Sequence, residues 1–239
     1  MTRVLVTGGG TGIGRAIAQS FAASGHDVTI AGRRKEPLED TARAGNIAIR
    51  LADITDEAQV TALFDQPYDI VIANAGAGAG TRVVDTSLED WERTLRVNLT
   101  GTFLTFREAL KSMQSGGRLI AIASTASLQG GANIAAYSAA KHGVLGLVRS
   151  LAQEVARKGI TCNAVCPGFV DTEIADEAVR NVMAHLNIDR DAATARLVAR
   201  NPMRRMIDPA EVVAAVRFLA SAEATMVNGH ALSVSGGEI

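Results

Sequence analysis

The first residues of the chain join a short apolar run to a glycine-rich turn and then to a helical pattern, and this order strongly limits the possible folds. Residues 3–7 hold a short continuous apolar run, Val4-Leu5-Val6, which predicts a parallel strand covered on both faces. Apolar residues at helical spacing begin directly after the glycines of 8–14. Such a turn lets the backbone amides at a helix N-terminus approach a pyrophosphate. We therefore expect a dinucleotide-binding α/β fold, with cofactor contacts from Gly8, Gly10, Thr11, Gly12, Ile13 and Gly14.

Further strand-like runs recur along the chain, and helical patterns separate most of them. This alternation predicts a doubly wound, Rossmann-type parallel sheet with helices on both faces. We find no internal repeat and no long low-complexity run, so we expect one domain spanning 1–239. Residues 173–207 lack a strand pattern and interrupt the alternation, which predicts a helical substrate lid with an apolar underside. The strands expected after the first are 26–31, 47–51, 68–73, 118–123, 160–165 and 231–234.

Composition and charge exclude several classes of protein. The net charge is −1 and the basic residues are scattered, so we expect neither nucleic acid nor an anionic membrane as the main partner. No apolar run reaches membrane-spanning length, and a strand pattern starts within the first residues, which leaves no room for a signal peptide. We therefore expect a cytoplasmic protein.

The two cysteines predict neither a disulfide nor a metal site. Cys162 and Cys166 fall on one face of one predicted strand, roughly 13 Å apart. That separation is too long for a disulfide. No histidine or acid lies nearby at ligand spacing, so both are expected to be buried thiols.

The end of the second predicted strand bears on the choice of coenzyme. In dinucleotide folds this strand end meets the adenosine ribose, where an acid selects NAD and an arginine accommodates the phosphate of NADP. Here Gly32 is followed by Arg33 and Arg34, and no acid is present. These residues favour NADP(H) over NAD(H), because a guanidinium fork matches phosphate oxygens. The alternative is that both arginines are ordinary surface charge at the start of a helix.

Two more strand ends supply candidate cofactor contacts, because open α/β sheets hold their ligands at the carboxyl ends of the strands. Asp53 either accepts a hydrogen bond from the adenine amine or caps the helix that follows it, and the two roles are compatible. The candidates at these two ends are Asp53, Ile54, Asn74, Ala75 and Gly76.

A long amphipathic helix is expected over 88–113, and Asn98 interrupts it. Apolar residues recur there at steps of three and four. Asparagine is a poor residue for a helix interior, because its amide competes for backbone hydrogen bonds, and Gly101 follows within a turn. We therefore predict a kink with a functional asparagine.

A tyrosine and a lysine lie four residues apart at the start of a predicted helix. At this spacing the side chains of Tyr137 and Lys141 share one face. A neighbouring ammonium lowers the pKa of a phenol from its usual value of about 10, which makes the phenol usable as an acid or base. Ser124 stands at the end of the strand at 118–123. The helix at 137–156 is apolar on two sides, which favours burial against the sheet and against a partner subunit.

The motifs together, in this order, resemble those of the short-chain dehydrogenase/reductase family over the whole chain. The resemblance implies a seven-stranded parallel sheet. More narrowly, the sequence is similar to bacterial 3-oxoacyl thioester and polyketide ketoreductases and to 3-hydroxyacyl-CoA dehydrogenases. The motifs are Thr7-Gly8-xxx-Gly12-x-Gly14, Asn74-Ala75-Gly76, Asn98, Ser124, Tyr137-xxx-Lys141 and Pro167-Gly168-xxx-Thr172.

The same resemblance implies a role for each matching residue. Tyr137 would be the general acid or base, and Ser124 would donate a hydrogen bond to the substrate oxygen. Lys141 would lower the pKa of Tyr137 and hold the nicotinamide ribose. The remaining implied roles are a water relay at Asn98, a sheet brace at Asn74, and nicotinamide contacts from Pro167, Gly168, Val170 and Thr172. One departure concerns Thr11, where members that bind NADP often carry a basic residue.

Three functions remain open on the sequence alone. The leading one is NADP(H)-dependent reduction of a ketone to a secondary alcohol, and the second is an NAD-dependent alcohol or 3-hydroxyacyl-CoA dehydrogenase working oxidatively. A dinucleotide-sensing scaffold is the third, although the tyrosine or lysine expected to be lost there is present. Ala126, Leu128 and the loop at 78–80 suggest an apolar pocket for an acyl thioester, cyclic ketone or aromatic ketone. We expect a homotetramer built through the helices at 137–156 and 88–113.

Overall fold

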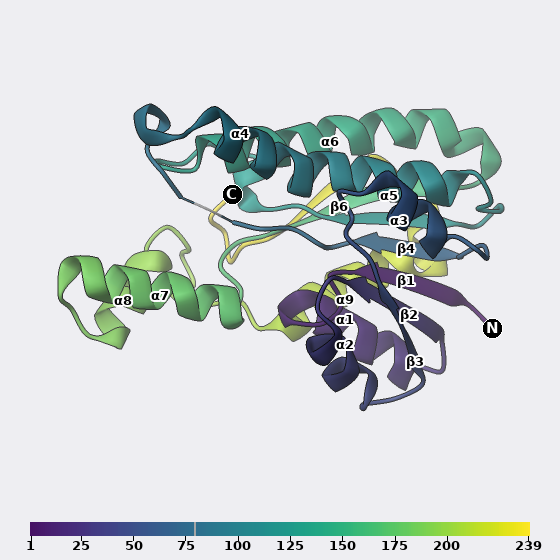
Figure 1. Cartoon of the computed structure of the whole chain (residues 1–239), viewed down its shortest axis with the longest axis horizontal. Helices are drawn as coiled ribbons and strands as arrows, with labels where there is room; N and C mark the ends of the chain where they lie inside the picture. The colour runs from purple at the N-terminus through teal and green to yellow at the C-terminus, as the bar shows by residue number, and fades with distance from the viewer. Residues whose placement is uncertain (79) are drawn as a thin grey trace.

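The computed structural model describes residues 1–78 and 80–239, so Ala79 of the expected pocket loop lies outside the described residues. Its centre is a seven-stranded parallel sheet in the order β3-β2-β1-β4-β5-β6-β7 (Figure 1). The expected fold class and strand number are confirmed. The strands are β1 (Arg3–Thr7), β2 (Asp27–Gly32), β3 (Ile47–Leu51), β4 (Ile70–Ala73), β5 (Arg118–Ile122), β6 (Thr161–Pro167) and β7 (Ala231–Val234).

The strand order reverses at β1, and this reversal determines where a ligand can bind at the edge of the sheet. Strands β1 to β3 follow one another towards one edge, whereas β4 lies on the other side of β1 and the later strands continue from it. Val4 of β1 therefore pairs with Val28 of β2 on one side and with Ile70 of β4 on the other. Connections leave such a point towards opposite faces of the sheet, and a crevice opens beyond the strand ends between them.

Helices cover both faces of the sheet (Figure 1). Alternate residues of one strand point into the two layers: Val4 and Val6 pack with the α1 and α9 side, and Leu5 packs with the α5 and α6 side. Burial on both faces explains the continuous apolar runs of the sequence. One layer holds α1 (Gly12–Ala23), α2 (Lys35–Ala42) and α9 (Pro209–Ala220), and the other holds α3 (Glu57–Leu63), α4 (Leu88–Leu95), α5 (Gly101–Leu110) and α6 (Ala135–Val155).

The helix expected over 88–113 is divided into three parts. Between α4 and α5 lies a π-helical turn, η2 (Arg96–Thr100), with Asn98 at its centre. The hydroxyl of Thr102 donates to the backbone carbonyl of Asn98 at 2.9 Å. A π turn inserts an extra residue into a helix and is frequent at functional sites. The predicted irregularity at Asn98 is confirmed, and its form is this turn.

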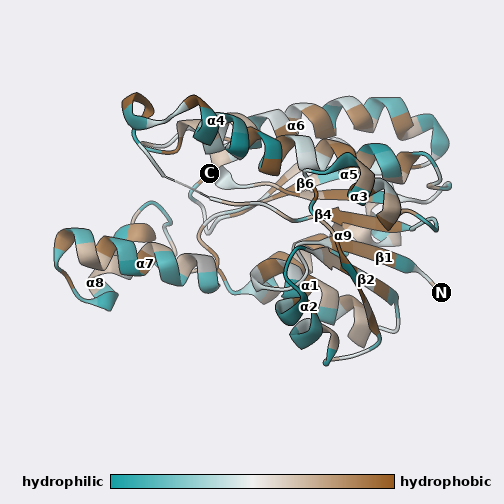
Figure 2. Cartoon of the chain, in the orientation of Figure 1, coloured by the Kyte–Doolittle hydropathy of each residue, from teal (hydrophilic) through white to brown (hydrophobic). Residues whose placement is uncertain are grey.

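Residues 173–207 fold into two helices that project from the end of the sheet (Figure 1). These are α7 (Glu173–Leu186) and α8 (Arg190–Leu197), and Figure 2 shows polar and apolar residues alternating along α7. The two ends of the segment meet at a neck, where the N–H of Asp171 donates to Ile207 O and the N–H of Ile207 donates to Phe169 O, both at 2.9 Å. These hydrogen bonds hold the beginning and the end of the segment together.

The cysteines behave as expected, and no described helix is a membrane span. Cys162 and Cys166 are free and fully buried. Burial raises the pKa of the Cys162 thiol to about 12 and that of Cys166 to about 11. Over residues 1–78 and 80–239, no helix is long and apolar enough to cross a membrane. The same residues contain no group of three His, Cys, Asp or Glu side chains placed to hold a metal ion.

Candidate active site

The glycine-rich turn between β1 and α1 leaves a helix N-terminus open to an anion. Thr11 caps α1 in an extended conformation, and the first turn of α1 carries no acidic side chain. A Cβ on Gly14 would lie 2.3 Å from the carbonyl oxygen of Gly8, so that position accepts only glycine. Gly12 has φ +51°, in the left-handed region that glycine tolerates. The exposed amides and the helix dipole favour negative charge at this point.

Asn74 ties the end of β4 to that turn. Its Nδ2 donates to Thr7 O at 2.9 Å and to Gly8 O at 3.1 Å. In return, the Thr7 hydroxyl accepts the N–H groups of Asn74 and Ala75, both at 3.1 Å. These four bonds fix the two strand ends that border the crevice, as the bracing role inferred for Asn74 requires.

Asn98 clamps the loop that follows β4. Its Oδ1 accepts the N–H of Ala77 at 3.2 Å, and its Nδ2 donates to Ala77 O at 2.9 Å and to Thr94 O at 3.0 Å. The side chain is 1% exposed. A Cβ on Gly76 would lie 2.8 Å from Asn98 Oδ1, so the clamp also needs glycine there. Sequence reasoning predicted a functional asparagine but missed this contact, because the pairing of Asn98 with Ala77 is not a local feature.

The Lys141 side chain places a buried ammonium over the ring of Tyr137. Its Nζ donates to Ile122 O, at the end of β5, at 2.9 Å. The side chain is 5% exposed, and desolvation lowers its pKa to about 8. The group is therefore mostly cationic at pH 7. Its Nζ lies 5.6 Å from the centroid of the Tyr137 ring.

Tyr137 is partly buried in the first turn of α6. Burial raises the pKa of its phenol, and the neighbouring Ser124 hydroxyl acts in the opposite direction but less strongly. The net direction is opposite to the lowering expected from Lys141, because desolvation of the buried phenol dominates in this structure. The Lys141 ammonium lies over the ring and gives a hydrogen bond to the Ile122 carbonyl.

Ser124 is fixed by a tight turn at the end of β5. It caps the 3₁₀ turn η3 (Thr125–Ser127), its Oγ accepting the N–H of Ala126 at 3.1 Å. Its own N–H donates to the hydroxyl of Ser127 at 3.2 Å. Since Ser124 Oγ is an acceptor in this arrangement, its O–H proton remains available for donation to another oxygen.

The end of β2 brings Arg33 close to Asp53. Arg33 Nη1 lies 4.0 Å from Asp53 Oδ2, and Arg33 and Arg34 are both exposed. Asp53 Oδ1 accepts the N–H and hydroxyl of Thr55 at 2.9 and 2.8 Å. Asp53 does not cap α3: Asp56 does, accepting the N–H of Gln59 at 3.1 Å. The capping alternative is therefore wrong, because the cap lies three residues further along the chain.

The segment after β6 reaches the glycine-rich turn. The Thr172 hydroxyl donates to Val170 O at 3.2 Å, and its methyl group lies 3.3 Å from the position of a Cβ on Gly12. Glu173 Oε1 lies 3.6 Å from Arg15 Nη1. This ion pair links α7 to α1 beside the turn, and no local pattern in the sequence indicates it. Pro167 and Gly168 border the same crevice, with the N–H of Gly168 donating to Val234 O at 3.1 Å.

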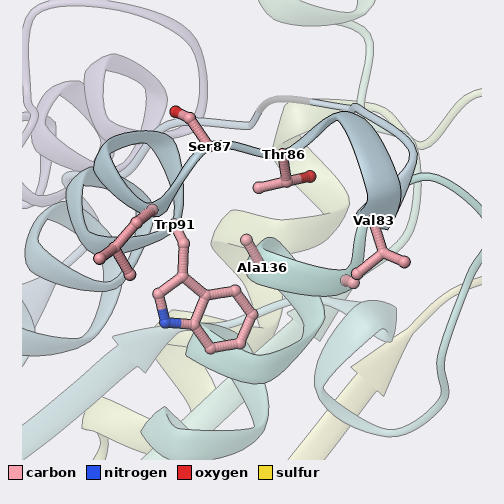
Figure 3. A pocket seen from close by; sticks show the side chains of 7 residues that line it. Val83, Thr86, Ser87, Trp91 and Ala136 are labelled. Carbon is pink, nitrogen blue, oxygen red and sulfur yellow. The ribbon is translucent and has the colours of Figure 1, made fainter.

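A cavity of about 330 Å³ adjoins the first turn of α6 (Figure 3). The ring of Trp91 and the methyl group of Ala136 border the same space. None of the residues singled out in the sequence lines it, although Ala136 precedes Tyr137. The lining residues are Val83, Thr86, Ser87, Leu88, Trp91, Ala135 and Ala136.

Comparison with known proteins places this geometry in a family. A family profile described as enoyl-(acyl carrier protein) reductase matches residues 8–238. The granaticin polyketide synthase putative ketoacyl reductase 1 of Streptomyces violaceoruber is 36% identical, over 98% of this chain and 91% of the relative. The 3-oxoacyl-[acyl-carrier-protein] reductase MabA of Mycobacterium tuberculosis is 35% identical over the same shares. This chain is a short-chain dehydrogenase/reductase.

Solved structures agree with this assignment. A variant of actinorhodin polyketide ketoreductase, solved with NADPH, superposes with a TM-score of 0.93 at 34% identity, covering 99% of this chain and 97% of the other. Levodione reductase superposes with a TM-score of 0.90 at 30% identity, with coverage of 99% and 97%. Membership of the short-chain dehydrogenase/reductases makes the chain an oxidoreductase acting on C=O or CH–OH groups.

Proposed function

We propose that this short-chain dehydrogenase/reductase is a ketoreductase that uses NADPH to reduce a ketone to a secondary alcohol. The observation that carries the proposal is the meeting of Ser124, Tyr137 and Lys141 at one end of β5. Lys141 is bonded to Ile122, Ser124 is fixed at the same strand end, and the Ser124 hydroxyl approaches the Tyr137 phenol. The names of the curated relatives, ketoacyl and 3-oxoacyl reductases, support the same reaction.

The residues present fit a dinucleotide phosphate. The N-terminus of α1, whose first turn carries no acidic side chain, and the glycine-only position 14 form a cradle for the pyrophosphate. Arg33 and Arg34 would face the ribose phosphate, and Lys141 would hold the nicotinamide ribose. When bound, the nicotinamide supplies the hydride. The other proposed contacts are Gly8, Gly10, Thr11, Gly12, Ile13, Asp53, Ile54, Asn74, Ala75, Gly76, Pro167, Gly168, Val170 and Thr172.

The pKa values suit the reductive direction. Burial raises the pKa of Tyr137, so the phenol stays protonated at neutral pH and is ready to act as a general acid. Ser124 and Tyr137 then both donate hydrogen bonds to the ketone oxygen, which stabilises negative charge there as the carbonyl is reduced. Lys141, cationic below a pKa of about 8, stabilises the phenolate left after proton transfer. Asn98 retains an Oδ1 lone pair towards which we place the water of a proton relay.

The substrate we favour is a 3-oxoacyl thioester or a related polyketide, reached beneath a lid made of 173–207. The support is the naming of the relatives, together with the partly apolar turn that carries Ala126 and Leu128. The description of the matching family profile favours a second candidate, reduction of an enoyl thioester. An enoyl thioester also offers a carbonyl oxygen to the donors Ser124 and Tyr137, but its reduction ends with a proton on carbon. Ketone reduction ends with the proton on the oxygen itself, where a Tyr137 phenol bonded to that oxygen delivers it directly.

Oxidation of NADPH across a small panel of compounds tests this proposal. The panel contains acetoacetyl-CoA, a bicyclic ketone and crotonyl-CoA, each at equal concentration. We expect turnover with at least one ketone and none with crotonyl-CoA. Turnover of crotonyl-CoA alone would replace the proposal with enoyl reduction. Tight NADPH binding with no turnover of any ketone or alcohol would support the scaffold alternative, and preferential oxidation of an alcohol with NAD would support the dehydrogenase.

We further infer that the chain assembles as a homotetramer through α4, α5 and α6. Phe103 of α5 is 41% exposed, with the guanidinium of Arg107 lying 5.4 Å from the centroid of its ring. On α6, the small residues Ala139 and Gly146 are exposed and permit close approach of another helix. Part of the second apolar side of α6 already contacts η2 and α4 of its own chain. Sedimentation of a monomer alone at micromolar concentration would contradict this assembly.

A further inference from the structure

The last residues of the chain return to the catalytic end of the sheet. After β7 the tail turns through Gly236 (φ +62°) and Gly237 (φ +90°). The turn brings Glu238 beside the end of β6, where its Oε2 lies 3.3 Å from the position of a Cβ on Gly168. The Glu238 side chain is only 13% exposed. A carboxylate this far buried needs partners of complementary charge or hydrogen bonding.

Glu238 has two partners, and they belong to different parts of the site. Gln129 Nε2 donates to Glu238 Oε1 at 3.0 Å. The backbone N–H of Gln129 donates to Thr125 O at 3.1 Å, so Gln129 belongs to the turn that fixes Ser124. The second partner is Arg200, whose Nε lies 3.8 Å from the same carboxylate oxygen.

Arg200 also contacts Gln129 directly. Its Nη2 donates to Gln129 Oε1, so the amide of Gln129 faces the carboxylate with its nitrogen and the guanidinium with its oxygen. Arg200 lies just after α8, in the part of 173–207 that returns to the sheet. Each of the three side chains thus contacts both of the others.

The residue after Arg200 packs against the same tail. Asn201 is 7% exposed, and its Oδ1 lies 2.1 Å from the position of a Cβ on Gly236. Its Nδ2 donates to Arg205 O and its Oδ1 accepts the N–H of Met203, which makes the segment around Arg200 a fixed turn. Contact between the returning segment and the tail therefore involves backbone packing as well as the charged side chains.

We propose that Glu238, Gln129 and Arg200 form a latch that holds the lid segment 173–207 against the Ser124 turn, with Glu238 as the positioning residue. The lid is already fixed at its neck by the hydrogen bonds among Phe169, Asp171 and Ile207. The latch adds a second attachment, on the side where the ketone would bind. The consequence for catalysis rests on the proposed function. Opening of the latch admits substrate, and the charges of Glu238 and Arg200 set how often the latch opens.

Trypsin digestion of the folded protein tests the latch without any turnover. Segment 173–207 contains six arginines and no lysine, so cleavage there reports exposure of the lid. Glu238→Gln keeps the shape of the side chain and removes the charge opposite Arg200. We expect its lid to be cleaved about two- to fivefold faster than that of the parent, as loss of an ion pair with a mostly exposed arginine predicts. Glu223→Gln, on the distant 3₁₀ turn η5 (Ala222–Ala224), should be cleaved at the parent rate.

Cleavage of Glu238→Gln at the parent rate or slower, with its near-ultraviolet circular dichroism unchanged, would overturn the latch. Should that variant fail to fold, Arg200→Met is judged in the same way from cleavage at the remaining five lid arginines. In a ketone assay, Glu238→Gln should raise KM severalfold, because a lid that opens more often also releases bound substrate more often. It should leave kcat unchanged, whereas a merely structural defect would lower kcat. If the parent reduces no ketone, the proposed function fails, and the digestion still decides the latch.

Discussion

Replacing Lys141 with methionine removes a buried ammonium from the centre of the site, and the free energy of unfolding should respond in a pH-dependent way. Lys141 is 5% exposed, and desolvation lowers its pKa from 10.5 to about 8. A base whose pKa is depressed by folding binds its proton less tightly in the folded than in the unfolded state. The charged lysine is therefore destabilising below pH 8, and this destabilisation disappears as the pH rises from about 8 to 10.5.

The size of the change in the free energy of unfolding follows from the pKa shift of Lys141. At about 1.4 kcal/mol per pKa unit, the buried charge destabilises the parent by about 3 kcal/mol at pH 7. The same linkage leaves about 1 kcal/mol at pH 10, where the unfolded lysine is still mostly protonated. The variant also leaves the Ile122 carbonyl without the Lys141 donor, but that loss does not change with pH. The free energy of unfolding of the variant minus that of the parent should therefore fall by about 2 kcal/mol between pH 7 and pH 10.

Urea unfolding of both proteins at pH 7 and pH 10, without cofactor, measures this difference. The raised pKa values of Tyr137 and Cys162 are carried by both proteins and cancel. Lys141 lowers the pKa of Cys166, but at about 11 this thiol stays mostly protonated in the folded parent at pH 10, so its effect on the difference is small. Lys158→Met, at an exposed lysine of the 3₁₀ turn η4 (Ala156–Lys158), should show no such pH dependence. An equal difference for Lys141→Met at both pH values would refute the argument, because the ammonium would then not be desolvated.

Two further predictions concern the coenzyme. Glu173→Gln should strengthen NADPH binding about two- to fivefold, since it removes negative charge beside the N-terminus of α1 and frees Arg15. Fluorescence titration measures this, with Glu177→Gln on the exposed side of α7 as control; an unchanged affinity for Glu173→Gln would contradict it. Gly32→Asp combined with Arg33→Ala should shift the ratio of kcat/KM from NADPH towards NADH by about ten- to a hundredfold, because an acid is added and a phosphate donor is lost. If the parent already uses NADH as efficiently as NADPH, the arginines are surface charge.

Local patterns in the sequence were sufficient for the sheet and for the central pair of the site. Strand β1 is a continuous apolar run because both its faces are buried, and Gly14 is glycine because a neighbouring carbonyl fills the space of its side chain. Tyr137 and Lys141 were paired by helical spacing alone. Each of these features is set within a few residues, which is the range that periodicity and turn chemistry report.

Features that depend on distant contacts were missed or misread. The π turn at Asn98 is held partly by Ala77, twenty-one residues away in sequence. The group of Gln129, Arg200 and Glu238 comes from three separate segments. The pKa of Tyr137 was misjudged because burial, which spacing does not reveal, outweighs the effect expected from Lys141. Asp56, and not Asp53, caps α3, because this helix begins later than its sequence pattern suggested.

The most direct test of the proposed chemistry is the turnover of Tyr137→Phe with NADPH and the best ketone of the panel. This variant loses the phenol proton and little else, so kcat should fall by at least about a hundredfold while NADPH affinity stays close to that of the parent. Tyr68→Phe is the matched control: it removes the buried hydroxyl of the chain's other tyrosine and should keep the parent rate. Retention of most of the parent kcat by Tyr137→Phe would contradict the assignment of Tyr137 as the general acid.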